Sequence, residues 1–127
     1  MLNFYVYVDG ADLDQCEANL TQAFSEFAVT SNLGAKVIND KYPRTPDLGP
    51  GDLSDWNLGL NFSTTALSET VANELMSFLT KLSQQTDRDF VIGMWHPNKR
   101  IPDDLMFIGA NSPMSKGTEL CLMVNGR

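Results

Sequence analysis

Regular alternation of apolar and polar residues between Trp56 and Phe62 is the feature that most limits the folds open to this chain. Every second residue of the stretch is apolar, and the residues between them are Asn57, Gly59 and Asn61. Successive side chains of a β-strand point to opposite faces of the sheet, so the pattern predicts a strand with one buried face. Such half-buried strands are typical of antiparallel sheets that pack on helices.

Five other segments show strand-like patterns of apolar residues. The most regular is residues 2–8, where apolar side chains alternate with residues that include Tyr5 and Tyr7. The others are residues 35–42, 89–95, 105–110 and 119–124. The last two are joined by a short loop that contains Pro113 and Gly117, and they are therefore predicted to pair as a C-terminal hairpin.

Two segments repeat apolar residues every three or four positions, which places those residues on one stripe of an amphipathic helix. The first stripe lies in residues 13–27 and the second in residues 71–82. Ser68 is positioned to cap the second helix, and either Asp9 or Asp12 to cap the first. Both helices are expected to lie on the sheet.

The predicted elements follow the order β-α-β-β-α-β-β-β, whose first six match the ferredoxin-like, split βαβ arrangement. We therefore predict an α+β fold with a mostly antiparallel sheet, two amphipathic helices on one face, and a C-terminal hairpin added to a ferredoxin-like βαββαβ core. The 127 residues fit a single domain, 1–127, with no linker or repeat that divides it. Residues 43–55 contain three prolines and two glycines and are expected to form a long loop.

Acidic residues outnumber basic ones, and most of the excess lies in the first half of the chain. Asp and Glu number 16 against 9 Lys and Arg, which gives a net charge of −7. Nine of the acids but only three of the bases precede Trp56, and no base precedes Lys36. Nucleic acids and anionic lipids present negative surfaces, so this charge disfavours both as nonspecific partners. A basic partner is favoured instead.

No apolar run approaches the roughly 20 residues that a membrane-spanning helix needs. The N-terminus lacks the positively charged region of a secretory signal and runs directly into the first predicted strand. Cys16 and Cys121 each lie in an apolar pattern, where a free cysteine acts as a small hydrophobic residue. We therefore predict a cytoplasmic protein without a disulfide.

The run of aspartates from Asp9 to Asp14 is open to three interpretations. Its carboxylates could cap a helix on a solvated acidic face, could contact a protein partner, or could ligate a hard cation. The spacing matches neither the calcium loop of EF-hands nor the paired aspartates of haloacid dehalogenase phosphatases, since Ala11 occupies the place of their second aspartate. We therefore expect no bound metal.

The sequence shows no catalytic motif. His96 is the only histidine, and both thiols that could work with it lie in apolar patterns that disfavour the thiolate. Neither a G-x-S-x-G elbow nor a glycine-rich phosphate loop is present. Tyr5 and Tyr7 share a strand face, as base-stacking residues of RNA-recognition motifs do, but the matching face of the third strand carries no aromatic residue. We therefore predict a protein that is not an enzyme and binds no cofactor and no RNA.

In size, acidity and lack of catalytic motifs, the chain resembles the small immunity proteins that neutralise bacterial toxins delivered by contact-dependent inhibition or type VI secretion. The resemblance is one of general character over the whole chain and rests on no motif. It implies a non-catalytic protein that binds a cognate toxin, often a nuclease, through carboxylates that face the toxin's cationic groups. The residues expected at that interface are acids of the first half and one tryptophan, namely Asp9, Asp12, Asp14, Glu17, Asp47, Asp52, Asp55 and Trp56.

The alternative function is that of a small-molecule-binding regulatory or enzymatic domain on the same fold. Residues 43–55 would then form a lid over the ligand, since lids are typically long loops that contain glycine. A metabolite that raises the unfolding temperature would favour this alternative. Stoichiometric co-purification with a basic protein would favour the immunity protein.

Overall fold

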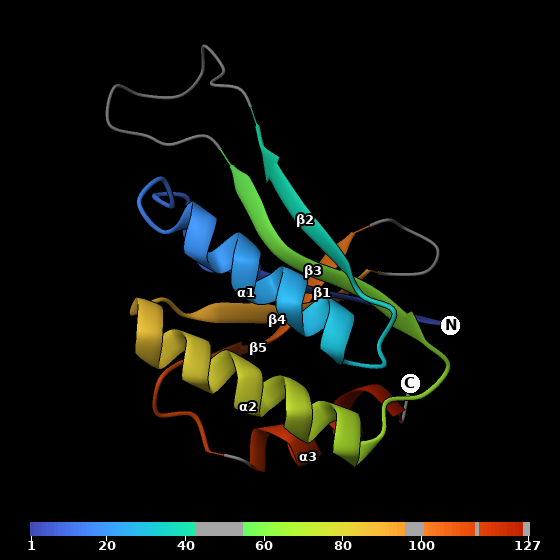
Figure 1. The fold of residues 1–127 in the computed structure, drawn as a ribbon. Helices are drawn as coiled ribbons and strands as arrows, with labels where there is room; N and C mark the ends of the chain where they lie inside the picture. The colour runs from blue at the N-terminus through green and yellow to red at the C-terminus, as the bar shows by residue number, and fades with distance from the viewer. Residues whose placement is uncertain (43–54, 96–100, 114, 126–127) are drawn as a thin grey trace.

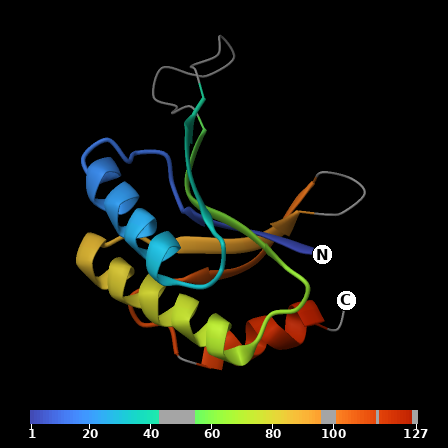
Figure 2. The same ribbon diagram turned by 45° about the vertical axis from the view of Figure 1, so that its right-hand side comes forward.

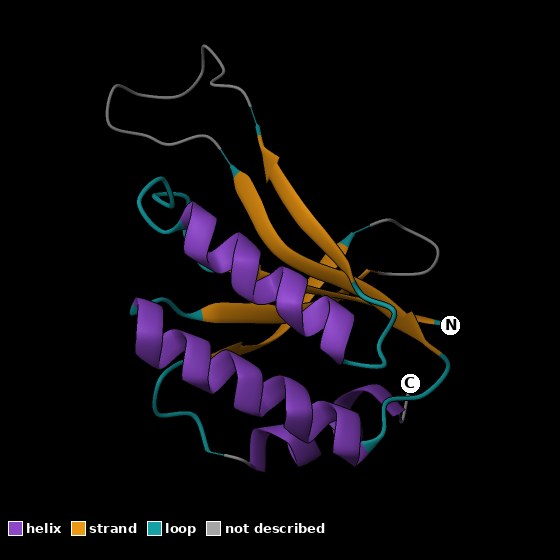
Figure 3. Cartoon of the chain, in the orientation of Figure 1, coloured by secondary structure: helices purple, strands orange, loops and turns teal. Residues whose placement is uncertain are grey.

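The computed structural model describes residues 1–42, 55–95, 101–113 and 115–125. Within them the chain forms five strands and three helices in the order β-α-β-β-α-β-β-α (Figures 1 and 3). The strands are β1 (Leu2–Val8), β2 (Lys36–Lys41), β3 (Trp56–Thr64), β4 (Phe90–Trp95) and β5 (Pro102–Ile108), and the helices are α1 (Glu17–Thr30), α2 (Glu69–Thr86) and α3 (Ser115–Asn125). The predicted α+β fold is confirmed.

The strands form one antiparallel sheet in the order β2-β3-β1-β4-β5. Because β3 lies between β1 and β2, and β1 lies between β3 and β4, each of α1 and α2 connects two strands that run in the same direction. This is the connection of a split βαβ unit. Strand β5 and helix α3 extend the fold beyond these two units, and the assignment of the core to the ferredoxin-like class stays a prediction.

Helices α1 and α2 cover one face of the sheet, and α3 lies beside α2 (Figure 2). The pleat of β1 turns Phe4, Val6 and Val8 toward these helices, and all three side chains are buried. They pack in one core with helix residues such as Phe24 and Leu79. The two helical stripes predicted from the sequence are thus the core-facing sides of the helical layer.

Helix α1 begins later than predicted. Its first residue is Glu17, and Cys16 occupies the N-cap position without a side-chain hydrogen bond to the helix. Neither Asp9 nor Asp12 caps α1, so this prediction is wrong. The reason lies after α2, where the guanidinium of Arg88 donates 2.7 Å hydrogen bonds to both the carboxylate and the carbonyl of Asp12.

The C-terminal segment is a helix, so the predicted C-terminal hairpin is wrong. Helix α3 buries Gly117, Leu120, Cys121 and Val124, which recur with helical spacing on one stripe. Residues 119–124 are nearly all apolar, and a short apolar run does not distinguish a strand from a buried helix segment. Strand β5 is therefore an edge strand of the sheet.

Helix α2 is capped at both ends. Ser68 Oγ accepts a 3.2 Å hydrogen bond from the amide of Val71, which confirms the predicted N-cap. At the other end Asp87 has a left-handed backbone, with φ 58° and ψ 36°, and its amide donates to the carbonyl of Ser83. A left-handed residue with a Cβ is sterically unfavourable, and here it also places a carboxylate at the negative end of the helix dipole.

Asp87→Gly is expected to stabilise the protein by about 0.5–1 kcal/mol, because glycine adopts the left-handed conformation without steric cost. Asp87→Asn is the matched control, since it removes the charge but keeps the Cβ, and it should add only about 0.3 kcal/mol. Urea unfolding followed by circular dichroism measures both free energies. A glycine variant less stable than the wild type would contradict this account of the cap.

Candidate functional site

The sheet face opposite the helices carries the side chains that alternate with the core residues. On β1 these are Tyr5 and Tyr7, and across from them on β3 lie Gly59 and Asn61. None of the helices in the described part of the chain covers this face (Figure 2). The two tyrosines are nevertheless only 2% and 9% exposed. Contacts within the sheet itself contribute to this burial.

Each tyrosine of β1 lies opposite a glycine in a neighbouring strand, and at Gly93 this lets the ring of Tyr5 lie along the sheet. Tyr7 is paired with Gly59 of β3, and Tyr5 is paired with Gly93 of β4. A Cβ on Gly93 would lie 2.2 Å from both Cζ and Oη of Tyr5, so the ring fills the space that a larger residue would need. A glycine inside a strand often marks such a close approach, and an aromatic ring across it covers the backbone that glycine leaves open.

The two tyrosines join Trp95, at the end of β4, in a continuous aromatic surface. Tyr5 and Tyr7 stack with their ring centroids 5.1 Å apart and their planes 20° from parallel. Trp95 meets Tyr5 edge-on, with centroids 5.5 Å apart. Each aromatic pair of this kind stabilises by roughly 0.5–1.5 kcal/mol beyond the area that it buries. The surface of Tyr5, Tyr7 and Trp95, termed the aromatic floor, is therefore fixed by the fold.

A β-bulge in β5 brings a carboxylate to the aromatic floor. The pairing of β4 with β5 is regular up to Ile92, but the next residue, Gly93, pairs with Asp104 and skips Leu105. Without the bulge Leu105 would lie opposite Gly93 on the open face. Bulges re-aim side chains in this way. The hydroxyl of Tyr5, whose ring crosses Gly93, consequently donates a hydrogen bond to the carboxylate of Asp104.

Both phenols of the floor are held in their neutral form. Burial raises the pKa of Tyr5 far above its ordinary value, and the hydrogen bond and negative charge of Asp104 raise it further. Burial also raises the pKa of Tyr7, although its hydrogen bond to Asn61 acts in the opposite direction. The Tyr7 hydroxyl donates to Asn61 Oδ1 at 2.8 Å. At neutral pH the two hydroxyls are thus hydrogen-bond donors.

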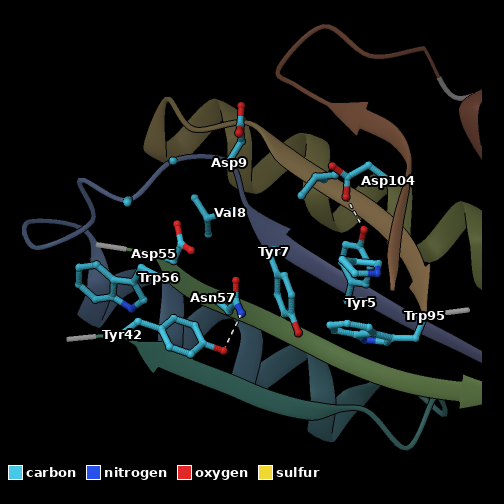
Figure 4. Close-up of a pocket in the computed structure, with 14 residues that line it drawn as sticks. Tyr5, Tyr7, Val8, Asp9, Tyr42, Asp55, Trp56, Asn57, Trp95 and Asp104 are labelled. Atoms are coloured by element: carbon cyan, nitrogen blue, oxygen red, sulfur yellow. Dashed lines mark hydrogen bonds between the residues drawn. The ribbon is translucent and has the colours of Figure 1, made fainter. Parts of the chain in front are cut away.

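A groove of about 600 Å³ lies over this face of the sheet (Figure 4). Besides the aromatic floor, its lining includes Tyr42, which follows β2, and Asn57 of β3. The amide of Asn57 lies 3.5 Å from the hydroxyl of Tyr42. The groove lining therefore combines aromatic side chains with polar groups.

Three carboxylates line the groove, and they are termed the groove carboxylates. They belong to Asp9 at the end of β1, Asp55 just before β3, and Asp104 on β5, and all three residues are exposed. Among the described residues no Lys or Arg forms an ion pair with any of them. The described part of the lining also contains no Lys or Arg. The groove thus combines aromatic rings with negative charge that no described cation neutralises.

Three other predicted interface residues, Asp12, Asp14 and Glu17, contact polar partners within the chain. Their partners are the guanidinium of Arg88 at 2.7 Å, the ammonium of Lys41 at 3.3 Å and the amide of Asn39 at 2.8 Å, respectively. The hydrogen bond from Arg88 lowers the pKa of Asp12. These residues lie just before α1 or at its first position and are termed the α1 acids. They lie outside the groove lining, and two of the three already have a cationic partner.

Trp56 is mostly buried at the start of β3, where it packs in the core and borders the groove. Its indole N–H donates a 2.7 Å hydrogen bond to Asn39, and the ammonium of Lys41 lies 4.5 Å over its ring. Asp47 and Asp52, which were also predicted at the interface, lie outside the described residues, as do His96 and residues 43–54 of the predicted lid.

Of the predicted interface residues, the structure brings Asp9, Asp55 and Trp56 to the groove. Sequence reasoning missed Asp104 and the aromatic floor, because it tested the two tyrosines only as base-stacking residues. The available signal was a glycine inside the strand pattern on either side of β1, since such glycines mark close approach.

Within the described residues, no group of three or more His, Cys, Asp or Glu side chains could hold a metal ion, and no helix is long and apolar enough to cross a membrane. Cys16 and Cys121 are free thiols. Comparisons of the chain with protein-family models, with characterised proteins and with solved structures find no match. Its function must therefore be inferred from the groove itself.

Proposed function

We propose that this chain is a non-catalytic, cytoplasmic binding protein that holds a basic segment of a partner protein in the groove. The observation that carries the proposal is the lining of the groove, where three carboxylates border the aromatic floor and no described Lys or Arg faces them. Aromatic rings and arginine dominate the energetics of protein interfaces, so a cationic segment complements this lining. Charge complementarity also accelerates encounter.

The aromatic floor supports the groove because its side chains are ordered before a partner binds. Tyr5 is held by stacking on Tyr7, by contact with Gly93 beneath it, and by its hydrogen bond to Asp104. Ordering a mobile side chain at an interface costs roughly 0.5–1.5 kcal/mol. A floor that is already ordered avoids this cost.

The charge of the whole chain supports a basic protein over other macromolecules. A net charge of −7 repels nucleic acid and anionic membrane surfaces. We propose a bacterial toxin as the partner, which would make the chain an immunity protein of the kind it resembles. A toxin that acts on nucleic acid needs cationic groups to hold phosphates, and the groove carboxylates complement such groups.

Affinity purification of the tagged chain from its native cells, followed by measured binding to whatever protein co-elutes, tests this proposal. We expect an equimolar basic protein with the wild type. Replacing the three groove carboxylates by asparagine is expected to weaken its binding by roughly 100-fold, because each lost contact to a buried cation costs about 1 kcal/mol or more.

The matched control removes the same charge outside the groove, by replacing the α1 acids with asparagine or glutamine. These acids act at longer range, so their loss should slow association and flatten its salt dependence while changing the affinity less than about tenfold. Equal loss of affinity in the two triple variants would mean that total charge, and not the groove, holds the partner. Co-elution of an acidic protein would contradict the proposal directly.

A small cationic molecule is the second candidate ligand, and the size of the groove favours it. A volume of about 600 Å³ falls in the range of ligand pockets. Tyr42 and Asp55, which flank residues 43–54, both line the groove. A thermal-shift screen of amines and guanidines distinguishes this candidate, because a ligand that binds only the folded state raises the unfolding midpoint, and does so further as its concentration increases.

A further inference from the structure

We infer that the groove recognises the guanidinium group of an arginine side chain that the partner protein presents, in preference to the ammonium group of lysine. This specificity rests on the proposed function and names the chemistry that the groove distinguishes. The preference for guanidinium follows from two features of the groove, the aromatic rings that remain accessible and the carboxylates near them.

The rings that a ligand can reach are those of Tyr42 and Trp95. Tyr42 is 49% exposed and Trp95 is partly exposed, whereas stacking and burial hide most of Tyr5 and Tyr7. In Figure 4, Tyr42 and Trp95 lie at opposite ends of the groove lining. A guanidinium is planar and weakly hydrated and stacks on aromatic faces, but an ammonium is compact and strongly hydrated.

Each accessible ring belongs to a residue whose backbone lies next to, or within a few residues of, an aspartate that lines the groove. The amide of Tyr42 donates a 2.8 Å hydrogen bond to the carbonyl of Asp55, so these two residues are neighbours across β2 and β3. Trp95 is paired with Pro102, two residues before Asp104 on β5. A guanidinium can stack on a ring and at the same time donate two parallel hydrogen bonds to a carboxylate. Lysine cannot make that combination.

Nucleobases also stack on aromatic rings, but the groove disfavours them. Their phosphates would meet the groove carboxylates, and no described lining residue offers a cation to a phosphate. An uncharged ring would leave the carboxylates without a cationic partner. A planar cation can stack on the aromatic rings and also pair with the carboxylates.

Three short peptides that differ only in carrying arginine, lysine or citrulline at the same positions test this inference. An NMR titration of the intact protein, followed at the indole N–H of Trp95, gives each dissociation constant. We expect the arginine peptide to bind about tenfold tighter than the lysine peptide, and the neutral citrulline peptide to show no saturable binding.

Substitutions separate the part played by the ring from that played by the charge. Tyr42→Ala should reduce the preference for arginine over lysine to about threefold or less, and Tyr42→Phe, which keeps the ring, should retain it. Asp55→Asn should weaken the binding of both cationic peptides, and that of the arginine peptide more, because only the guanidinium loses a two-bond contact to the carboxylate. Glu74→Gln is the charge-matched control on the exposed side of α2, and it should leave both dissociation constants unchanged.

Equal affinities for the arginine and lysine peptides would overturn the guanidinium specificity and leave the proposed function intact, because charge alone would then explain binding. Absence of binding by both peptides would overturn the specificity and the proposed function together. Free arginine that binds as tightly as the arginine peptide would overturn the assignment of the ligand to a protein and favour the small-molecule candidate.

Discussion

Replacing Gly59 by alanine is expected to destabilise the protein by more than about 4 kcal/mol. The added Cβ would lie 1.8 Å from the carbonyl oxygen of Val6 and 2.8 Å from its carbonyl carbon. Both atoms belong to the backbone of β1, so no side-chain movement can relieve the overlap, and the central pair β1 and β3 must separate. Tyr7, which is paired with Gly59, would lose its place on the sheet.

Gly34→Ala is the matched control, because it adds the same methyl group to a glycine with no atom within 4 Å of the added Cβ. The backbone of Gly34 is left-handed, with φ +64°, so its loss should come to about 1 kcal/mol. Urea unfolding of the three proteins compares the free energies. If the free energy of unfolding of the Gly59→Ala protein lies within about 1 kcal/mol of the wild-type value, β1 and β3 do not approach this closely. The account of how the tyrosines are placed on the sheet would then be wrong.

The sequence predicts those parts of the fold whose determinants are close together in the chain. In β1 and β3 the alternation of side chains between the two faces of the sheet can be read within a few residues. In α2 the apolar stripe and the Ser68 cap both lie in one continuous segment. The start of α1 depends instead on Asp12 and Arg88, which are 76 residues apart in sequence. No local pattern indicates that this pair draws Asp12 away from the helix.

The residues of the candidate site also fall into two groups, those that a local sequence pattern predicts and those that depend on the tertiary structure. Asp9 and Asp55 were predicted because the charge of the first half is visible in the sequence, and the structure places both at the groove. Asp104 reaches the groove only through the bulge that skips Leu105. The burial of Tyr5 likewise depends on β4 lying beside β1 with Gly93 opposite the ring. Strand order and register are tertiary properties, and periodicity within one strand does not determine them.

Leu120→Ala is expected to destabilise the protein by about 2–5 kcal/mol, whereas Leu122→Ala should change stability by less than about 0.5 kcal/mol. Leu120 is fully buried, with 0% exposure, and Leu122 is 75% exposed. Two residues apart in a strand share one face, so a strand would make the two substitutions alike. In a helix the same residues lie about 200° apart around the axis. The difference between the two stability losses therefore distinguishes helix α3 from the hairpin that the apolar run of residues 119–124 predicts.

Thermal and urea unfolding of the two variants give the comparison, and Leu122→Ala serves as the control because it removes the same atoms from the same helix. Equal losses at both positions would mean that residues 119–124 form a strand next to β5. A loss confined to Leu120 would mean that this segment packs on α2, where an added Cβ on Gly117 would lie 2.2 Å from Oδ1 of Asn73. In that arrangement β5 remains the edge strand of the sheet, and no other described strand pairs with its outer side.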